Sequence, residues 1–370
     1  MAETEHLQMV ASTISDYAKG ASDETIRDSL PLAMLNKYGK VTYNHSGKSM
    51  TWQVKFSKNQ LRQVGDAGEY VFNEAVKHKQ CSLDWRGCYS TDKITEKQRL
   101  MNRGPEALIN LYATKGPELI SEAKESFCAE LFGDGNATGH TNSIHGFESC
   151  LAERTTPGAG DIIAEPGDSY AGLVTNLGYY GGTWSSARST KPNSTLAKDW
   201  PYGNSLTPEY DFFSPKLFNA SSSGWPGSGT TWADNCGYVL RAAIHTVRNT
   251  TGSPAPTLVL MGVDWYTDLC NLLDTKFRTL TPHQEAADLG FKGNQIQYEG
   301  AVVTTDFYCP SSVAYGFKTD TVELCCMYDD LFYAEGPTKD FVSNSYLFRV
   351  GFFGNMKLRP RHLTKIKEYA

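Results

Sequence analysis

The sequence predicts an α+β fold, in which strands and helices occupy separate stretches of the chain, with one smaller α/β unit. Apolar residues spaced three and four apart between Ile94 and Phe132 indicate a long amphipathic helix. Residues 41–56 alternate apolar and polar side chains, which is typical of half-buried strands. Residues 232–277 follow a helix, strand, helix pattern, which predicts the α/β unit.

Composition indicates a folded chain with a large core. The 370 residues, 40% of them hydrophobic, can form two or three domains. Nine scattered cysteines without CxxC spacing argue against a zinc site or a disulfide framework, and predict buried thiols in a reducing compartment. The start, MAETEHLQMV, has no signal-peptide pattern, and no apolar run approaches the length of a membrane span. We therefore expect a soluble chain made in the cytoplasm.

Residues 1–40 form an acidic N-terminal segment with weak hydrophobic periodicity. A short helix is expected around Met9 to Tyr17, and a second helix begins near Asp23. Leu30-Pro31 should break that second helix, because the residue before a proline disfavours helical geometry. The segment has little core of its own, so it should pack on the rest of the chain or on a neighbouring copy.

Residues 41–92 are predicted to form a projecting hairpin. One strand carries Val41 and Tyr43 and continues from Met50 to Phe56, and strand character returns at Cys81 to Trp85 after a long connection. An isolated two-stranded hairpin is marginal in water. With too little local partner surface, the arm and the hairpin should be ordered only by neighbouring subunits.

The long helix has recognisable ends. Thr95 and Gln98 suggest a capping box, and Gly133 begins a stop signal. Pro105 and Pro117 interrupt the pattern. A proline in a helix interior destabilises the helix by about 3 kcal/mol. The element is either one kinked rod or collinear pieces, and periodicity alone also allows two ordinary core helices.

The remaining chain is mostly loop up to about residue 230, and order returns at Thr231. Helices are expected at 232–249 and 263–277, flanking an apolar strand at 256–261. Further strands are expected at 301–305, 313–317 and 322–326. The chain end predicts paired strands, 344–353 and 356–363, around a turn at Gly354-Asn355.

This order of elements resembles the major capsid proteins of tailed bacteriophages, the Hong Kong 97-like fold. The residues that carry the resemblance are the helix ending in Leu-Phe-Gly-Asp-Gly at 131–135, APTLVLMGVDWYTDL at 255–269, VVTTDFYCP at 302–310 and LFRVGFFGNMKLRPRHLTKI at 347–366. The resemblance covers almost the whole chain. Pro117 departs from it, since spine helices of this family are usually uninterrupted.

The resemblance implies a division of the chain. It comprises an N-terminal arm at 1–40, an extended hairpin loop (E-loop) at 41–92, a peripheral domain with the spine helix at 93–149 and 319–370, and an axial domain at 150–318.

The resemblance also implies a structural function in the virion. Copies of the chain would assemble as hexamers and pentamers into an icosahedral shell around double-stranded DNA, inside the host cytoplasm. Portal, scaffolding and decoration proteins are the other implied partners, with non-specific DNA contact, no membrane and no cofactor. An encapsulin-like nanocompartment shell has the same fold and remains an alternative.

An enzymatic function has weak support. His140 and His145 lie near Asp134 and Glu148, but a spacing of five in a glycine-rich loop does not place both imidazoles on one helical face as metal binding by HExxH does. P-loop, G-x-S-x-G and G-x-G-x-x-G motifs are absent from the sequence. We expect no catalytic, cofactor or metal site, and a hydrolase using the His140/His145 loop is the less favoured alternative.

Charge order predicts contacts between subunits. Residues 29–65 hold six basic side chains and no acidic one, whereas 299–335 hold seven acidic side chains and one lysine. Single surface ion pairs contribute about 0–1 kcal/mol, but a shell repeats each contact in every subunit. DNA binding is a competing use of the basic run. The predicted intersubunit contacts are Lys48, Trp52, Lys55, Lys58, Arg62, Trp85, Asp320, Glu323, Asp329 and Asp330.

Overall fold

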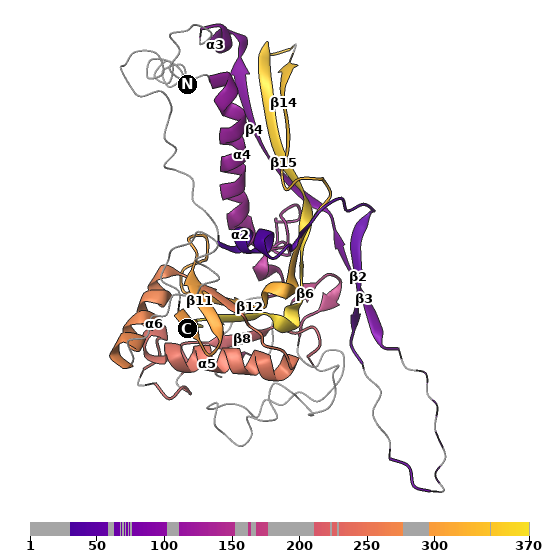
Figure 1. Ribbon diagram of the computed structural model, residues 1–370, viewed down its shortest axis with the longest axis vertical. Coiled ribbons are helices and arrows are strands. Elements are labelled where there is room, and N and C mark those ends of the chain that lie inside the picture. Colours follow the sequence, from indigo (N-terminus) through magenta and orange to yellow (C-terminus); the bar gives the residue numbers. More distant parts are fainter. Residues whose placement is uncertain are drawn as a thin grey trace.

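A computed structural model describes most of the chain and shows two sheets joined at a central core (Figure 1). It describes residues 30–57, 63–66, 68, 70, 72, 74, 76–101, 111–151, 162–163, 168–176, 211–276 without 223 and 228, 296–340, and 342–369. Within these residues the sheets have five and seven strands, and two short two-stranded pairs accompany them.

The five-stranded sheet and helix α4 form one elongated part of the molecule (Figure 1). Its strands are β1 (Val41–Thr42), β4 (Arg86–Thr95), β13 (Val322–Cys326), β14 (Tyr333–Asp340) and β15 (Ser345–Leu358). Strand β15 pairs with β4 over ten residues, from Ser345 opposite Thr95 to Gly354 opposite Arg86. Helix α4 (Leu111–Glu130) runs along this sheet, and its Leu119 is buried in one cluster with Ile94 of β4 and Val350 of β15.

The predicted long helix is present in part, with a later start. Ile94 and Thr95 are strand residues, because they pair with β15 and Ile94 is buried beneath α4. Helix α3 (Glu96–Met101) then begins with the predicted capping box. The backbone N–H of Gln98 donates to Thr95 Oγ1 at 3.3 Å, and the backbone N–H of Thr95 donates to Gln98 Oε1 at 3.0 Å. Pro105 lies outside the described residues. Helix α4 continues through Pro117, and Gly133 follows its end.

The predicted turn at Gly354-Asn355 is wrong. Strand β15 passes straight through both residues and stays paired with β13. A Cβ on Gly354 would overlap the Cys325 carbonyl, so this glycine allows close approach of two strands and does not turn the chain. The buried Asn355 side chain accepts hydrogen bonds from His145 N and Met356 N at 2.9 Å, and its amide donates to Asp84 O at 3.0 Å.

The seven-stranded sheet forms the second part. Its order is β10 (Ile296–Tyr298), β11 (Ala301–Thr305), β9 (Leu258–Met261), β12 (Val313–Phe317), β16 (Thr364–Lys367), β8 (Lys216–Asn219) and β5 (Ile162–Ile163). Helices α5 (Trp232–Thr251) and α6 (Val263–Lys276) flank β9 in sequence, which confirms the predicted helix–strand–helix unit. Trp232 and Trp265 stack 4.2 Å apart between them. The last strand of the chain, β16, belongs here and not beside β15.

Helix α2 (Leu30–Lys37) begins at the Leu30-Pro31 pair, where a break was expected, and the earlier helix expected from Asp23 lies outside the described residues. Proline is tolerated in the first helical turn, where its missing N–H has no intrahelical role. Leu30 N donates to Asp306 Oδ2 at 2.9 Å, and Leu30, Leu32 and Leu35 are buried in the central core. This part of the predicted arm therefore packs on its own chain.

The central core lies where the two sheets meet. It includes the 3₁₀ turn η1 (Phe147–Cys150) and the short pair β6 (Ser169–Tyr170) and β7 (Leu173–Val174). The buried Tyr170 hydroxyl donates to Met356 O at 2.7 Å and accepts from Leu358 N at 3.1 Å. The cysteines are mostly buried, with Cys88 and Cys270 only half-buried. Of the helices described, none is long and apolar enough to span a membrane.

Candidate assembly surfaces

The projecting hairpin consists of β2 (Ser49–Lys55) and β3 (His78–Asp84), paired antiparallel along their full length. Its base is anchored in its own chain, since Met50, Cys81 and Leu83 are buried in the central core. The expectation that the hairpin lacks local partner surface is therefore wrong for its base. Val41 and Thr42, which were expected to belong to the hairpin, pair with β13 as β1 instead.

Beyond this base, the hairpin carries exposed apolar side chains. Tyr70, Phe72 and Val76 are 77%, 92% and 76% exposed. Strands β2 and β3 point away from the two sheets (Figure 1). Exposed aromatic residues gathered on one projecting segment are typical of a surface that another chain covers.

The face of the five-stranded sheet opposite α4 carries an aromatic strip, which consists of Tyr89, Tyr328, Tyr333 and Phe353. Tyr89, Tyr328 and Phe353 are 75%, 43% and 43% exposed. The Tyr333 ring stacks on Tyr328 at 4.5 Å and on Phe353 at 5.9 Å.

Two glycines form the floor of the aromatic strip. The Phe353 ring covers Gly87, where a Cβ would lie 2.5 Å from ring carbons. The Tyr333 ring likewise covers Gly351. Since neither glycine projects a side chain, the rings lie close against the backbone of the sheet.

Two of the predicted acidic contacts are paired within their own chain. Asp320, with a side chain 63% exposed, lies 3.9 Å from Lys40 Nζ and 3.8 Å from Lys318 Nζ. Glu323 forms a 2.7 Å ion pair with Lys357. The sequence could not show the pairs with Lys40 and Lys357, because Lys40 follows α2 and Lys357 lies in β15, far along the chain from their partners.

Asp329 and Asp330 remain exposed beside Tyr328 of the aromatic strip. Neither forms an ion pair within the described part of the chain. The pKa of Tyr43 is raised by burial first, and then by the charges of Cys326 and Asp330. The strip therefore ends in a small acidic patch.

Among the predicted basic and aromatic contacts of the hairpin, some side chains are exposed and others contact their own chain. Lys48 and Lys55 are exposed and form no ion pair among the described residues, and Lys58 and Arg62 lie outside those residues. Trp52 is half-buried, 6.4 Å from the Tyr170 ring, with Lys357 Nζ 5.8 Å from its centroid. Trp85 donates its indole N–H to Gly47 O at 3.0 Å.

The loop after α4 is held by Arg86, a residue that no sequence pattern singled out. Its guanidinium donates to the carbonyls of Ser143, Gly135 and His140 at 2.5, 2.7 and 3.4 Å. His145 is only 4% exposed, and burial, followed by the Arg86 charge, lowers its pKa to about 4. Its imidazole is thus neutral at physiological pH, and the loop supports the junction of the two sheets.

Metal ligation finds no support in the described residues, where no three His, Cys, Asp or Glu side chains are grouped to hold an ion. The side chain of Glu148 instead accepts hydrogen bonds from Lys365 Nζ, at 2.7 Å, and from the Tyr315 hydroxyl.

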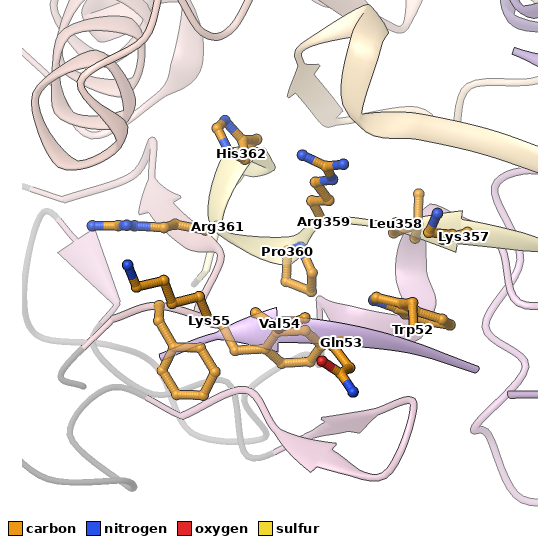
Figure 2. Close-up of a pocket in the computed structure, with 12 residues that line it drawn as sticks. Trp52, Gln53, Val54, Lys55, Lys357, Leu358, Arg359, Pro360, Arg361 and His362 are labelled. Atoms are coloured by element: carbon orange, nitrogen blue, oxygen red, sulfur yellow. The ribbon is translucent and has the colours of Figure 1, made fainter. Parts of the chain in front are cut away.

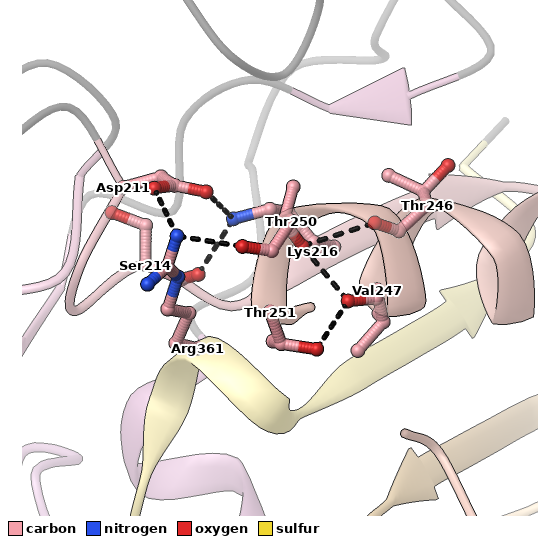
Figure 3. A network of polar contacts seen from close by, with 8 residues as sticks. All are labelled: Asp211, Ser214, Lys216, Thr246, Val247, Thr250, Thr251 and Arg361. Atoms are coloured by element: carbon pink, nitrogen blue, oxygen red, sulfur yellow. Dashed lines mark hydrogen bonds and ion pairs between the residues drawn. The ribbon is translucent and has the colours of Figure 1, made fainter. Parts of the chain in front are cut away.

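A buried ionic network links the start of β8, the turn before β16 and the C-terminus of α5 (Figure 3). Asp211 accepts from Lys216 Nζ at 3.3 Å and from the Arg361 guanidinium at 3.1 Å. Arg361 also donates to Thr250 O at 2.6 Å, at the C-terminus of α5. Burial lowers the pKa of Lys216, and the neighbouring Asp211 opposes that effect.

A cavity of about 350 Å³ lies between β2 and residues 357–362, which include the 3₁₀ turn η5 (Pro360–His362) (Figure 2). Pro360 and Val54 line the cavity from opposite sides, midway along its length (Figure 2). The cavity thus lies between the base of the hairpin and the turn that leads into β16 of the seven-stranded sheet.

Comparison with known proteins identifies the fold. The sequence matches no family model and no curated protein. Its structure is similar to the capsid asymmetric unit of Cyanophage A-1(L), with a TM-score of 0.64, 11% identity, and coverage of 98% of this chain and 99% of that chain. The capsid of the native GTA particle has a TM-score of 0.56 and 9% identity, with coverage of 98% of each chain. The mature capsid of bacteriophage PhiM1 has a TM-score of 0.54 and 10% identity, with coverage of 96% of this chain and 91% of that chain. The chain therefore has the tailed-phage capsid fold, which confirms the Hong Kong 97-like fold predicted from the sequence.

Proposed function

We propose that the chain is the major capsid protein of a tailed bacteriophage, which assembles as hexamers and pentamers into an icosahedral shell enclosing double-stranded DNA. The observation that carries this proposal is the extent of the structural match. Three capsid structures each cover at least 96% of the chain, and the chain covers at least 91% of each of them. The resemblance thus includes the hairpin and the elongated sheet, which a compact soluble enzyme does not need.

The division into N-terminal arm, E-loop, peripheral domain and axial domain belongs to this proposal. The five-stranded sheet with α4 corresponds to the peripheral domain, and the seven-stranded sheet with α5 and α6 to the axial domain. Because β16 lies in the second sheet, we assign 364–367 to the axial domain and move the boundary accordingly.

Self-assembly is supported by surfaces that a monomer would leave unused. The exposed aromatic residues of the hairpin connection and the aromatic strip both present apolar area to solvent. We propose that the hairpin of an adjacent copy packs against the aromatic strip. Burial of such apolar area contributes about 25 cal/mol per Å², repeated at every interface of the shell.

The electrostatic seam between copies is proposed in a reduced form. Asp320 and Glu323 already have partners in their own chain, so Asp329 and Asp330 are the acidic groups left to attract the hairpin lysines. The hairpin side of the seam comprises Lys48 and Lys55, together with Lys58 and Arg62. Portal, scaffolding and decoration proteins, and non-specific DNA contact, complete the proposed partners.

Electron microscopy of purified particles tests the proposal. The full-length chain should form closed shells, whereas deletion of residues 59–76 should leave a folded subunit that forms none, because the hairpin base stays in the core. Circular dichroism of the deletion variant provides the folding control. Full-size particles from the deletion variant would refute the role of the hairpin, and a stable full-length monomer would refute the shell function.

A charge swap tests the seam. Asp329→Lys with Asp330→Lys, or Lys48→Glu with Lys55→Glu, should each weaken assembly at low salt, since like charges then face each other. Combining all four changes should restore assembly. The effect should fade near 1 M salt, where the Debye length is about 3 Å. Normal assembly with lost DNA retention in the lysine variant would instead assign these lysines to DNA.

A further inference from the structure

The cavity between β2 and residues 357–362 is cationic. Lys55, Lys357, Arg359 and Arg361 line it, and its described lining holds no acidic side chain. Lys55 and Arg361 extend toward the same end, while Lys357 and Trp52 lie at the other (Figure 2). Lys55 forms no ion pair among the described residues, so at least one ammonium group at this end lacks a counter-charge.

Two buried nitrogen atoms of the lining also lack partners. Arg361 Nε and His362 Nδ1 are inaccessible to solvent and form no hydrogen bond to any described residue. Arg361 Nε is always a donor, and a buried donor without a partner costs about 1–3 kcal/mol and commonly marks the place of an unseen ligand or water.

The surrounding charge is strongly positive at His362. Burial lowers the pKa of His362 to about 4, and four cations add to this effect: Arg361, Arg359, Lys318 and Lys216. The nearby carboxylate, Asp211, is already shared by Lys216 and Arg361. Even with Asp320 near Lys318, these cations outnumber the carboxylates beside them, so an added anion near Arg361 would be attracted.

We propose that this cavity is a binding site for a free phosphate-sized oxyanion, held between Lys55 of the hairpin base and Arg361 of η5. A phosphate group suits the site because it carries most of two negative charges at neutral pH and presents several acceptor oxygens to an arginine and a lysine. A cavity of about 350 Å³ accommodates a small molecule, whereas a DNA duplex is too wide to enter it.

The site bridges two parts of the molecule. Lys55 is the last residue of β2, where the hairpin connection begins, and Arg361 is fixed to Asp211 and the end of α5. A bound oxyanion would join these parts and hold the hairpin base against the end of the seven-stranded sheet where β8 and β16 begin. The binding step depends on the fold of one subunit and not on shell assembly, so the two proposals fail independently.

Titration of the unassembled full-length chain with inorganic phosphate tests the site. Calorimetry should show saturable binding, compared with sodium chloride at matched ionic strength. Lys55→Gln should weaken phosphate binding about tenfold, as expected for loss of one charge-assisted hydrogen bond. Lys48→Gln is the matched control on the same strand region and should bind phosphate as the unmodified chain does. Lys55 is exposed, so its replacement leaves folding intact.

Three outcomes would overturn the proposal. One is the absence of saturable phosphate binding beyond the ionic-strength effect. Another is equal phosphate affinity in the Lys55→Gln and Lys48→Gln variants. The third is Lys55-dependent binding of a short DNA duplex without binding of inorganic phosphate, which would assign Lys55 to backbone contact with DNA instead.

Discussion

Replacing Asp211 by asparagine is expected to destabilise the folded subunit strongly. The Asp211 carboxylate lies between two cations, 3.3 Å from Lys216 Nζ and 3.1 Å from the Arg361 guanidinium. The side chain of Lys216 is 0% exposed and that of Asp211 is 7% exposed. Asparagine keeps the shape of the side chain but removes its charge, so both cations remain near each other with nothing to balance them.

Loss of one partner from a buried ion pair costs about 3–5 kcal/mol, because the other charge stays buried without compensation. Asp320→Asn is the matched control. Asp320 also lies near two lysines, at 3.9 and 3.8 Å, but its side chain is 63% exposed. Solvent screens such a pair, so this variant should lose at most about 1 kcal/mol.

Urea unfolding of unassembled subunits, followed by circular dichroism, measures both losses. The difference in free energy of unfolding between the Asp211→Asn variant and the unmodified chain should also become smaller as pH rises. Burial already lowers the pKa of Lys216, and removal of Asp211 lowers it further, so the folded variant gains by losing that proton. Equal losses in the Asp211 and Asp320 variants, or a deficit independent of alkaline pH, would refute this reasoning.

Three further outcomes follow from individual residues. Pro117→Ala should raise the free energy of unfolding by up to about 3 kcal/mol, measured by urea denaturation, because α4 regains a helical hydrogen bond. A decrease would show that packing around α4 depends on the proline. Gly354→Ala should lower the melting temperature, since its Cβ would overlap the Cys325 carbonyl, whereas Gly65→Ala, with nothing within 4 Å, should not; equal melting temperatures would contradict close strand approach. His145 has a folded pKa of about 4, below the ordinary 6.5, so the unfolded chain binds the proton first. Its contribution to stability is complete above pH 6.5 and falls by up to about 3 kcal/mol as pH drops to 4, and His145→Gln should lack this loss in acid unfolding curves.

Patterns within one element predicted its type well. The capping box at Thr95 and Gln98 and the helix–strand–helix unit around β9 depend on residues a few positions apart, so periodicity and end signals sufficed. The same holds for the pairing of β2 with β3, because both strands alternate toward the central core.

Predictions that depended on distant partners were less accurate. Gly354 looked like a turn residue, since the sequence cannot show that β13 passes close to its backbone. Asp320 and Glu323 looked available to a neighbour, although Lys40, Lys318 and Lys357 reach them within one chain. The roles of the half-buried Arg86 and the buried Asn355 had no sequence signal, because single polar residues carry no period.

The α+β class, the order of elements and the family resemblance could be predicted from the sequence, because periodicity, caps and motif order are encoded locally along the chain. Which strands share a sheet, which charges are already paired, and where a cavity remains between β2 and η5 emerge only in the folded chain. Those properties arise from contacts between residues hundreds of positions apart, such as Leu30 with Asp306 and Glu148 with Lys365. Hydrophobic packing brings such residues together, and no local pattern specifies their partners.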